Sequence, residues 1–406
     1  MTTKSVKKVA LAYSGGLDTS VIVHWLKERY GCEVVAYCCD VGQGGELDGL
    51  EPRARALGAS EVVVEDLTDT FAHDYAFPTL RAAALYEGIY RLGTSIARPL
   101  IAARQVAAAR RFGCDALAHG CTGKGNDQVR FELTYMALAP DLTVLAPWRD
   151  PDWGIVSRED ALDYAAKHGL PVPMKKSDLF SRDANLWHIS HEGGPLENPA
   201  EVAPESMYRL TAAPADRPAT PAHVTIGFEQ GWPVSVDGRT LGPAALVGEL
   251  NVIAGRHGVG REDIVESRVV GMKSRGVYET PGGTVLAEAL EDLCRLTLTH
   301  DVLRTRAELA PRFADLVYRG EWFAPVREAL TAFVDKALEP VTGAVLVELH
   351  QGRARAVGRS SPRSLYDAGL ASFDMTGYEP KHAEGFIRIL GQPLAKAVRA
   401  GGAMNG

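Results

Sequence analysis

The chain has 406 residues, of which 46% are hydrophobic and 23% charged, so it can bury a large core, and we expect two domains. Its formal net charge of −7 argues against a general nucleic-acid binder. The apolar stretch after Lys7 and Lys8 breaks at Ser14 and is too short for a signal sequence or a membrane span, so we expect a cytoplasmic protein with neither a membrane nor a nucleic acid as partner.

The first predicted strand, Val9–Tyr13, runs directly into a turn rich in glycine and hydroxyl groups, Ser14–Ser20. Apolar residues then recur at helical spacing as far as Gly31. Glycine lets the backbone approach a ligand closely, and the hydroxyl groups are expected to cap the helix. The N–H groups of the turn and the positive end of the helix dipole then face one anion, so the pattern predicts a phosphate-binding loop.

The residues of this turn distinguish between several kinds of phosphate loop. A P-loop needs Gly-x-x-x-x-Gly-Lys followed by Ser or Thr, and the nearest match, at Gly123 and Lys124, lacks both the first glycine and the hydroxyl residue. The dinucleotide fingerprint Gly-x-Gly-x-x-Gly is not found in the first turn. The remaining pattern, Ser-Gly-Gly-x-Asp-Thr-Ser, resembles the signature of the ATP pyrophosphatases, which cleave ATP between its α- and β-phosphates. The alternative is a tight turn whose hydroxyl groups only cap a helix.

Strands and helices alternate through the N-terminal region, which predicts a doubly wound, mostly parallel α/β sheet. One helix is expected to open at Pro99 and stop before Gly113, and another to run from a cap at Ser157 to His168. Ligands collect at the carboxyl ends of the strands in such sheets. The further strands are predicted at Val34–Cys39, Glu61–Val64, Ala116–His119 and Val144–Ala146.

The alternation stops near Pro173, and a loop-rich stretch follows to about Pro221. Short strand-like runs then mix with helical patterns, which predicts an α+β second domain. The strands are expected at His223–Phe228, Val265–Gly271 and Ala344–Glu348, and the helices at Ala244–Gly255, Leu286–Thr297 and Arg327–Leu338. After Lys381 an amphipathic tail either packs on its own domain or crosses to a neighbouring subunit.

The six cysteines show no paired spacing and are interpreted as buried thiols. His188 and His191 have the spacing of a metal pair, but no third ligand lies near them in the sequence. The loop Gly120–Phe131 combines amide, hydroxyl, carboxylate and guanidinium groups. Such a loop can bind a zwitterion, and a polar surface loop explains it equally well.

Three further stretches, Tyr90–Pro99, Gly255–Arg261 and Gly271–Gly283, combine glycines with charged and aromatic residues. With these stretches and the first loop, the whole chain resembles the argininosuccinate synthase family from end to end. The resemblance implies a nucleotide-binding domain over residues 1–173, a synthetase domain over 174–380 and a C-terminal helical arm over 381–406 that ties together a homotetramer.

The resemblance also assigns the substrates. ATP would be bound by Ala12, Tyr13, Ser14, Gly15, Gly16, Leu17, Asp18, Thr19, Ser20, Cys39 and Gly120, with cysteine at position 39 where alanine is more usual. Asp18 would hold Mg²⁺, a hard cation that prefers oxygen ligands. Citrulline would be bound by Tyr90, Ser95, Asn126, Arg130, Ser181, Ser190, Glu266 and Tyr278, and aspartate by Thr122, Asn126 and Asp127.

The implied reaction forms a citrullyl-adenylate and pyrophosphate from citrulline and ATP, after which the amine of aspartate displaces AMP to give argininosuccinate. Asp18, Asp127 and Arg130 would be the catalytic residues, acting by alignment and by neutralising charge. Two alternatives remain open at this point: another adenylating ATP pyrophosphatase, and a nucleotide-sensing module that has the loop but no turnover.

Overall fold

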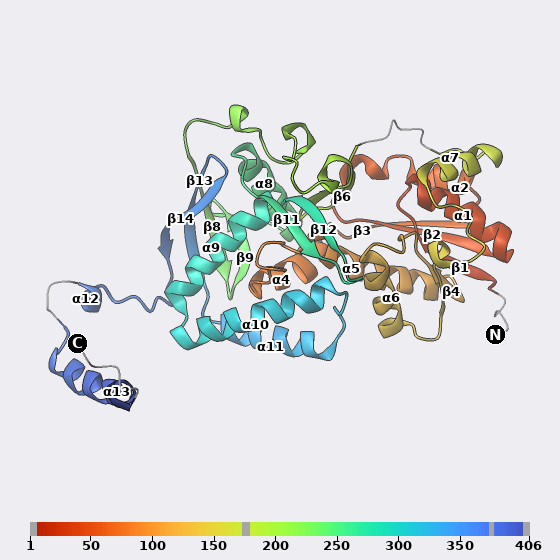
Figure 1. Cartoon of the computed structure of the whole chain (residues 1–406). Helices are drawn as coiled ribbons and strands as arrows, with labels where there is room; N and C mark the ends of the chain where they lie inside the picture. The colour runs from red at the N-terminus through yellow and green to blue at the C-terminus, as the bar shows by residue number, and fades with distance from the viewer. Residues whose placement is uncertain (1–5, 173–178, 373–376, 401–406) are drawn as a thin grey trace. The chain divides into compact units, whose positions relative to one another are not determined.

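Residues 6–172, 179–372 and 377–400 are described by a computed structural model (Figure 1). By their internal contacts the residues group into two units, 1–363 and 364–406, which are described separately. The domain boundary expected between residues 173 and 174 lies outside the described residues.

The N-terminal part of the first unit contains a five-stranded sheet, and all of its strand pairs are parallel. The strand order is β3-β2-β1-β4-β5, so the order reverses at β1, in the centre of the sheet. This confirms the predicted doubly wound sheet. The strands are β1 (Lys8–Ala12), β2 (Glu33–Asp40), β3 (Glu61–Asp66), β4 (Ala116–Ala118) and β5 (Thr143–Leu145).

Helices cover both faces of this sheet (Figure 1). Val9 and Leu11 of β1 pack with α1 (Leu17–Tyr30), α2 (Leu50–Ala56) and α7 (Arg158–Lys167). Ala10, whose side chain points to the other face, packs with α5 (Gly93–Arg111) and α6 (Asp127–Leu138). Because both faces of the central strands β2, β1 and β4 are buried, these strands are continuous apolar runs, which is why they could be recognised in the sequence.

One of the expected helices begins earlier than predicted. Helix α5 starts at Gly93, and Pro99 lies inside it. The hydroxyl group of Tyr90 accepts a hydrogen bond from the backbone N–H of Thr94 (3.0 Å), and Leu92 turns the chain with a φ of 62°. The start of α5 is therefore set by the Tyr90 hydroxyl and by the left-handed backbone conformation of Leu92, and neither feature is a usual signal for the start of a helix.

The rest of the first unit contains two antiparallel sheets, ordered β10-β9-β8-β13-β14 and β11-β12-β7-β6. Their strands are β6 (Ser181–Ala184), β7 (Ile189–Glu192), β8 (Ala222–Glu229), β9 (Trp232–Val236), β10 (Arg239–Thr240), β11 (Arg261–Ser267), β12 (Lys273–Glu279), β13 (Gly343–His350) and β14 (Arg353–Ser360). The helices are α3 (Thr68–Thr70), the π-helical turn Phe71–Ala76, α4 (Phe77–Arg81), α8 (Pro243–Arg256), α9 (Pro281–Thr297), α10 (His300–Tyr318) and α11 (Pro325–Leu338).

The predictions for this region are confirmed in part. β8, β13, α8 and α11 lie where they were expected, and α9 begins five residues before Leu286. The strand predicted over Val265–Gly271 is wrong, because β11 ends at Ser267 and the chain turns there into β12. Helix α10 was not predicted, nor were the short strands β6, β7, β9 and β10 or the edge strand β14. Hydrogen bonds to strands distant in the chain hold several of these elements, and local sequence patterns do not report such bonds.

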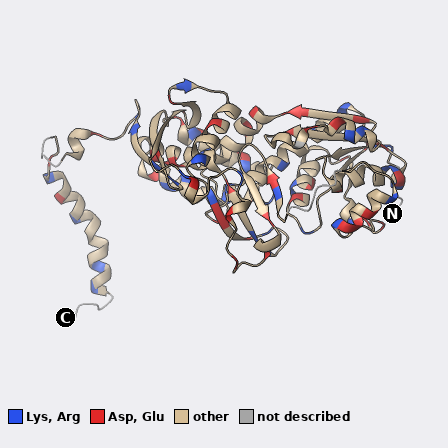
Figure 2. Ribbon diagram, turned by 90° about the horizontal axis from the view of Figure 1, so that it is seen from above, with Lys and Arg blue, Asp and Glu red and all other residues tan. Residues whose placement is uncertain are grey.

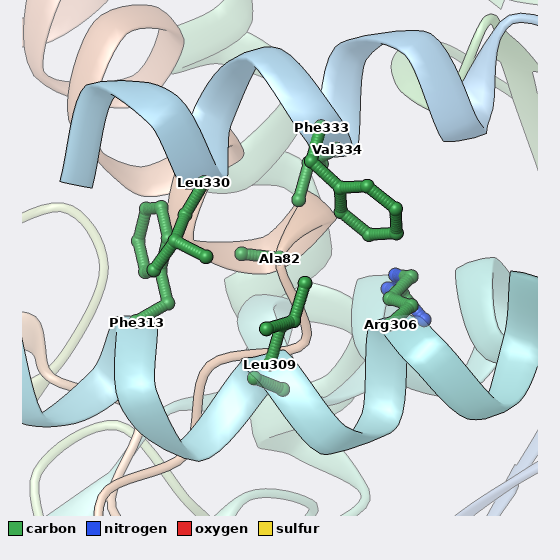
Figure 3. Close-up of a pocket in the computed structure, with 8 residues that line it drawn as sticks. Ala82, Arg306, Leu309, Phe313, Leu330, Phe333 and Val334 are labelled. Carbon is green, nitrogen blue, oxygen red and sulfur yellow. The ribbon is translucent and has the colours of Figure 1, made fainter. Parts of the chain in front are cut away.

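A hydrophobic cluster joins the parallel sheet to the antiparallel part. It contains Tyr37 and Cys39 of β2 together with Val224 of β8, Leu286 of α9 and Phe313 of α10. Figure 3 shows Leu309, Phe313, Leu330 and Val334 pointing towards one another around a cavity of about 10 Å³ between α10 and α11. That volume is roughly what one water molecule needs, so the space is a packing defect and not a ligand pocket.

Positive and negative residues are interspersed along the ribbon in Figure 2. Many form local ion pairs, such as Arg275 with Asp263 (2.6 Å) and Arg359 with Asp292 (2.7 Å). Of the six cysteines, five are buried as predicted, and Cys121 is partly exposed. None of the described helices has the length and apolar character needed to cross a membrane.

A buried carboxylate at the end of β12 holds the neighbouring chain in place. Glu279 accepts hydrogen bonds from the backbone N–H groups of Arg209 (2.7 Å), Leu210 (2.9 Å) and Thr211 (2.8 Å), from the Thr211 hydroxyl (2.5 Å) and from His191 (2.8 Å). Burial by itself raises the pKa of Glu279, but these donors outweigh it and lower the pKa below its ordinary value. The carboxylate therefore stays ionised and fixes the loop that precedes η6 (Pro214–Asp216).

Glu279→Gln is expected to lower the free energy of unfolding by about 2–4 kcal/mol at neutral pH, because an amide N–H₂ group faces backbone donors that need an acceptor. A carboxyl group whose pKa is lower in the folded than in the unfolded chain stabilises the fold at pH values above the unfolded pKa, and this stabilisation is lost as the pH falls. The difference in free energy of unfolding between the variant and wild type should therefore shrink below about pH 4. Denaturant titration across pH measures this. Glu229→Gln, an exposed change at the end of β8, is the control, and equal unfolding midpoints for the two variants would contradict the role of Glu279.

The second unit contains α12 (Ala368–Ala371) and α13 (Lys381–Ala400). Helix α13 is amphipathic, and its apolar side chains Phe386, Ile387, Ile389, Leu390, Leu394 and Val398 are exposed. The exposed apolar residues fit the predicted amphipathic tail.

Candidate active site

The predicted phosphate loop connects β1 to α1 at the carboxyl edge of the parallel sheet. Gly15 has a φ of 75°, and a Cβ atom there would lie 3.1 Å from the guanidinium of Arg53. The hydroxyl groups of Ser14 and Thr19 lie 3.1 Å apart across the turn. The expected hydroxyl cap is wrong: Gly16 is the N-cap residue of α1, and no described side chain caps it. The first N–H groups of α1 are thus available to an anion.

The other residues predicted to contact ATP lie at the same edge of the sheet. A Cβ atom on Gly120 would lie 3.0 Å from the side chain of Thr19, so the loop after β4 lies directly against the first turn of α1. Cys39 is the penultimate residue of β2, and its carbonyl accepts a hydrogen bond from the Gln43 side chain (2.6 Å). Burial raises the pKa of the Cys39 thiol to about 12, so it stays protonated and is no nucleophile.

Asp18 lies in the first turn of α1 and is exposed. Desolvation raises the pKa of its carboxyl group, and the charge of Arg158 opposes this shift. A single accessible carboxylate beside a phosphate loop fits Mg²⁺, which usually binds to one or two carboxylates, to substrate phosphates and to several waters.

The loop after β4 ends in a buried cluster of charges. Asp127, the first residue of α6, accepts hydrogen bonds from Arg98 (2.8 Å) and Arg130 (2.9 Å). Arg98 also pairs with Asp183 of β6 (2.8 Å). Burial opposes ionisation of Asp127, but the two guanidinium groups outweigh it and lower its pKa. The predicted residues Asp127 and Arg130 are therefore ionised partners, and Arg98 links them to the antiparallel sheet.

A group of tyrosines around Glu266 adjoins this cluster. Glu266 accepts hydrogen bonds from the hydroxyl groups of Tyr278 (2.9 Å) and Tyr318 (2.6 Å). The ring of Tyr90 stacks on that of Tyr278, with centroids 4.2 Å apart. Burial is the main cause that raises the pKa values of all three tyrosines, so they remain hydrogen-bond donors at neutral pH.

Asn126 and Arg130 connect the loop to the same tyrosine. Asn126 donates to the Tyr318 hydroxyl (2.9 Å) and accepts from the N–H of Val269 (2.9 Å). Arg130 donates from Nε to the Tyr318 carbonyl (3.0 Å). Residues from α6, α10 and the β11–β12 hairpin thus meet at Tyr318. This tyrosine joins three of the residues predicted to bind citrulline: Asn126, Arg130 and Glu266.

Ser95 and His188 each contain a buried polar atom without a hydrogen-bond partner among the described residues. Ser95 is fully buried, and its hydroxyl group has no hydrogen-bond partner among the described residues. His188 is also fully buried: Nε2 lies 3.0 Å from the Thr94 hydroxyl, and Nδ1 has no described partner. Burial lowers the pKa of His188 to about 4, so the ring is neutral. An unpaired buried polar atom is costly, and such atoms point to a bound ligand or water.

The remaining predicted residues lie on β6, β7 and the 120–126 loop. Ser190 is buried in β7, pairs with Tyr278 in the sheet and lies 3.5 Å from the carbonyl of Asp183. Ser181 is exposed at the start of β6, opposite Glu192. Thr122 is exposed in its loop. Neither Ser181 nor Thr122 belongs to the buried hydrogen-bond network described above.

Sequence reasoning missed several members of this network. Tyr318 is the last residue of a helix that was not predicted, and His188 was considered only as half of a metal pair. That pair is not supported: His191 is bonded to Glu279 and to Arg182 (3.1 Å), whereas His188 faces Thr94. Arg98 lies in the stretch Tyr90–Pro99, whose aromatic and charged residues could have indicated a functional role. Its bridge from Asp127 to Asp183 could not be predicted, because Asp183 belongs to another sheet.

Comparison with known proteins gives matches over almost the whole chain. A family model described as "Arginosuccinate synthase N-terminal HUP domain" matches residues 8–171, and one described as "Arginosuccinate synthase C-terminal domain" matches residues 180–397. The argininosuccinate synthase of Roseiflexus sp. (strain RS-1) is 57% identical over 391 residues, which cover 96% of each chain. The chloroplastic argininosuccinate synthase of Arabidopsis thaliana is 54% identical over 96% of this chain and 79% of its own. That of Syntrophus aciditrophicus (strain SB) is 54% identical over 95% and 96%.

Proposed function

This chain belongs to the argininosuccinate synthase family, and we propose that the network around Asp127, Arg130 and Glu266 is where it joins its two amino-acid substrates. The chain is a ligase that couples citrulline to aspartate with ATP as co-substrate, in arginine biosynthesis. The residue roles that follow are part of the proposal.

ATP binds with its phosphates on the loop Ser14–Ser20 and its base towards Cys39 and Gly120. The proposal is supported by the uncapped first turn of α1, whose N–H groups can stabilise the charge of the departing pyrophosphate. Asp18, in the first turn of α1, would hold Mg²⁺. When bound, the ion would supply charge neutralisation of the triphosphate.

Citrulline binds among the tyrosines. Its carboxylate and ammonium groups are matched by Arg130 and Glu266, and its ureido group lies towards the phosphate loop. The unpaired hydroxyl of buried Ser95 supports this placement, because a bound ureido or carboxylate group gives it the missing partner. The full proposed set is Tyr90, Ser95, Asn126, Arg130, Ser181, Ser190, Glu266 and Tyr278.

Aspartate binds beside citrulline, held by Thr122, Asn126 and Asp127. In the first half-reaction the ureido oxygen of citrulline attacks the α-phosphate of ATP, which gives a citrullyl-adenylate and releases pyrophosphate. The amine of aspartate then displaces AMP. No protein nucleophile is needed, so the contribution of the site is alignment and charge stabilisation.

The observation that carries the proposal is the continuous path from the phosphate loop to the charged cluster. Gly120 lies against Thr19, and six residues later the same loop delivers Asn126 and Asp127 to Arg98, Arg130 and Tyr318. The same loop therefore contributes to both proposed sites, with the nucleotide at one end and the amino acids at the other.

The test mixes the purified chain with Mg²⁺, ATP and citrulline, with and without aspartate, and measures pyrophosphate, AMP and argininosuccinate. We expect AMP and argininosuccinate in equal amounts, only with aspartate. Nucleotide binding without pyrophosphate release would indicate a sensing module, and AMP formation with another acceptor would indicate a different adenylating enzyme.

The proposal extends to organisation and location: a nucleotide-binding domain over residues 1–173, a synthetase domain over 174–380, and an arm over 381–406 that joins four copies in the cytoplasm. The exposed apolar residues of α13 support an arm that binds another subunit. Light scattering of the full chain measures the number of copies.

A further inference from the structure

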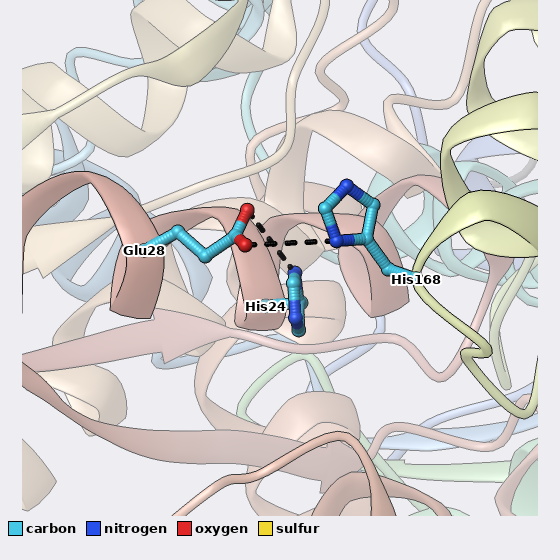
Figure 4. Close-up of side chains that lie close together, drawn as sticks. All are labelled: His24, Glu28 and His168. Carbon is cyan, nitrogen blue, oxygen red and sulfur yellow. Dashed lines mark ion pairs between the residues drawn. The ribbon is translucent and has the colours of Figure 1, made fainter.

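Two histidines and a glutamate converge on the outer side of the phosphate-loop helix, away from the site described above. Among the residues that the structure describes, the ligand atoms of His24, Glu28 and His168 all lie within 4.8 Å of one another (Figure 4). His24 and Glu28 are four residues apart on α1 and share one face of it. His168 is the C-cap residue of α7, which packs on α1.

The two distances from Glu28 to the imidazoles match those between ligands of a tetrahedral metal ion. The two carboxylate oxygens of Glu28 lie 3.5 Å from Nδ1 of His24 and 3.5 Å from Nδ1 of His168. A zinc ion with bonds of about 2.0–2.1 Å holds tetrahedral ligand atoms roughly 3.4 Å apart. Each imidazole thus lies at the required distance from one oxygen of Glu28. All the ligand atoms are within 4.8 Å of one another, so a small rotation of the side chains would bring them to the spacing of one ion.

Tyr164 of α7 orients all three side chains. Its hydroxyl donates to Glu28 (2.7 Å) and lies 3.0 Å from Nδ1 of His24, and its ring stacks on His168 with centroids 4.2 Å apart. These contacts hold the three side chains together, and an ion bound at Nδ1 of His24 would replace the proton that this nitrogen donates to Tyr164. His24 and His168 are about one-quarter exposed and Glu28 is half exposed, so water can reach the group and complete the coordination.

The charges of the group suit a cation. Two imidazoles and one carboxylate place nitrogen and oxygen ligand atoms together. Neutral imidazole and ionised carboxylate are the forms of these groups that bind metals. The nearby charges of Lys27 and Lys167 oppose a cation, but both side chains are exposed and therefore screened by solvent.

We propose that His24, Glu28 and His168 form a binding site for one divalent transition-metal ion of the Zn²⁺ class, which joins α1 to the end of α7. Imidazole ligands favour Zn²⁺ and related ions over Mg²⁺. His24 and Glu28 lie six and ten helical residues from Asp18, about 9 and 15 Å along the axis, so this site is separate from that proposed for Mg²⁺.

The test uses Co²⁺ as a spectroscopic substitute for Zn²⁺ on the full chain, after removal of bound metal with a chelator. We expect one Co²⁺ per chain with the intense visible absorption of a four-coordinate ion, displaced by Zn²⁺ and not by millimolar Mg²⁺. His24→Ala and His168→Ala should each weaken binding at least tenfold. The matched control is His223→Ala, because His223 forms an exposed pair with Glu348 (3.6 Å) like that of His24 with Glu28.

Equal Co²⁺ affinity in wild type and both ligand variants would overturn the proposal, as would thiolate-to-cobalt absorption, which would place the ion on a cysteine. Glu28→Gln keeps the shape of the most exposed ligand and tests the site even if a histidine variant unfolds. We expect it also to weaken Co²⁺ binding at least tenfold, with an unchanged circular dichroism spectrum, and unchanged affinity would contradict the site. Ligation with Mg²⁺ in buffers free of transition metals should be equal in wild type and Glu28→Gln, which separates this site from the proposed active site.

Discussion

Replacing Asp127 with asparagine is expected to lower kcat/KM for aspartate by about 10²–10³-fold, because truncating one partner of a hydrogen-bonded charge pair in a binding site costs about 2–5 kcal/mol. The carboxylate of Asp127 lies between Arg98 and Arg130. Asparagine keeps its shape but leaves the two guanidinium groups without their shared anion, and it removes the charge that we propose for binding the ammonium group of aspartate. Steady-state ligation with aspartate varied measures the effect.

The matched control for this change is Asp141→Asn. Asp141 also pairs with an arginine, Arg110 (2.7 Å), but both side chains are exposed, and exposed pairs contribute little. We expect activity within about twofold of wild type for this control. An Asp127→Asn variant that retains its circular dichroism spectrum and more than one-tenth of the wild-type kcat/KM would remove Asp127 from the proposed reaction.

Asp18→Asn is expected to lower kcat by about 10²–10³-fold, since the variant loses the carboxylate that we propose for Mg²⁺ and with it part of the charge stabilisation of the departing pyrophosphate. Asp18 is exposed, so the melting temperature should stay within about 2 °C of wild type. Initial rates at increasing Mg²⁺ give the readout, and we expect the variant to need more Mg²⁺ for its remaining activity.

Asp163→Asn, an exposed change on α7, controls for the loss of one surface charge. The role of Asp18 is refuted if its variant matches this control in both kcat and Mg²⁺ dependence. Because Asp18→Asn acts on the nucleotide and Asp127→Asn on aspartate, the two variants also separate the halves of the proposed reaction: pyrophosphate release from ATP and citrulline should fall more in Asp18→Asn.

Much of the structure of the nucleotide-binding part could be predicted from the amino-acid sequence. The central strands of the parallel sheet are buried on both faces and are apolar runs, and the turn after β1 shows its glycines and hydroxyl residues within seven positions. Interactions within a few residues govern such features. The exception at this loop is instructive: the hydroxyl groups do not cap α1, so its N–H groups are left for the ligand.

The predicted start of α5 was wrong and the β11–β12 hairpin was not predicted, both for one physical reason. Helix α5 begins at Gly93, in contact with His188: a Cβ atom on Gly93 would lie 2.2 Å from that ring. Strand β12 has three charged residues and a glycine among its seven positions and looks like a loop, yet it pairs with β7 and β11. Hydrogen bonds and packing to residues distant in the chain outweigh local propensity in both places.

The amino-acid order alone was sufficient for the phosphate loop, the parallel sheet and the family, because each depends on neighbouring residues whose pattern is visible. It did not reveal that Tyr318 joins Asn126 to Glu266, that Arg98 bridges Asp127 to Asp183, or that His168 faces His24 and Glu28. These groups come from segments up to 192 residues apart. Only the folded chain brings them within hydrogen-bond distance, where burial and neighbouring charges then fix their protonation states.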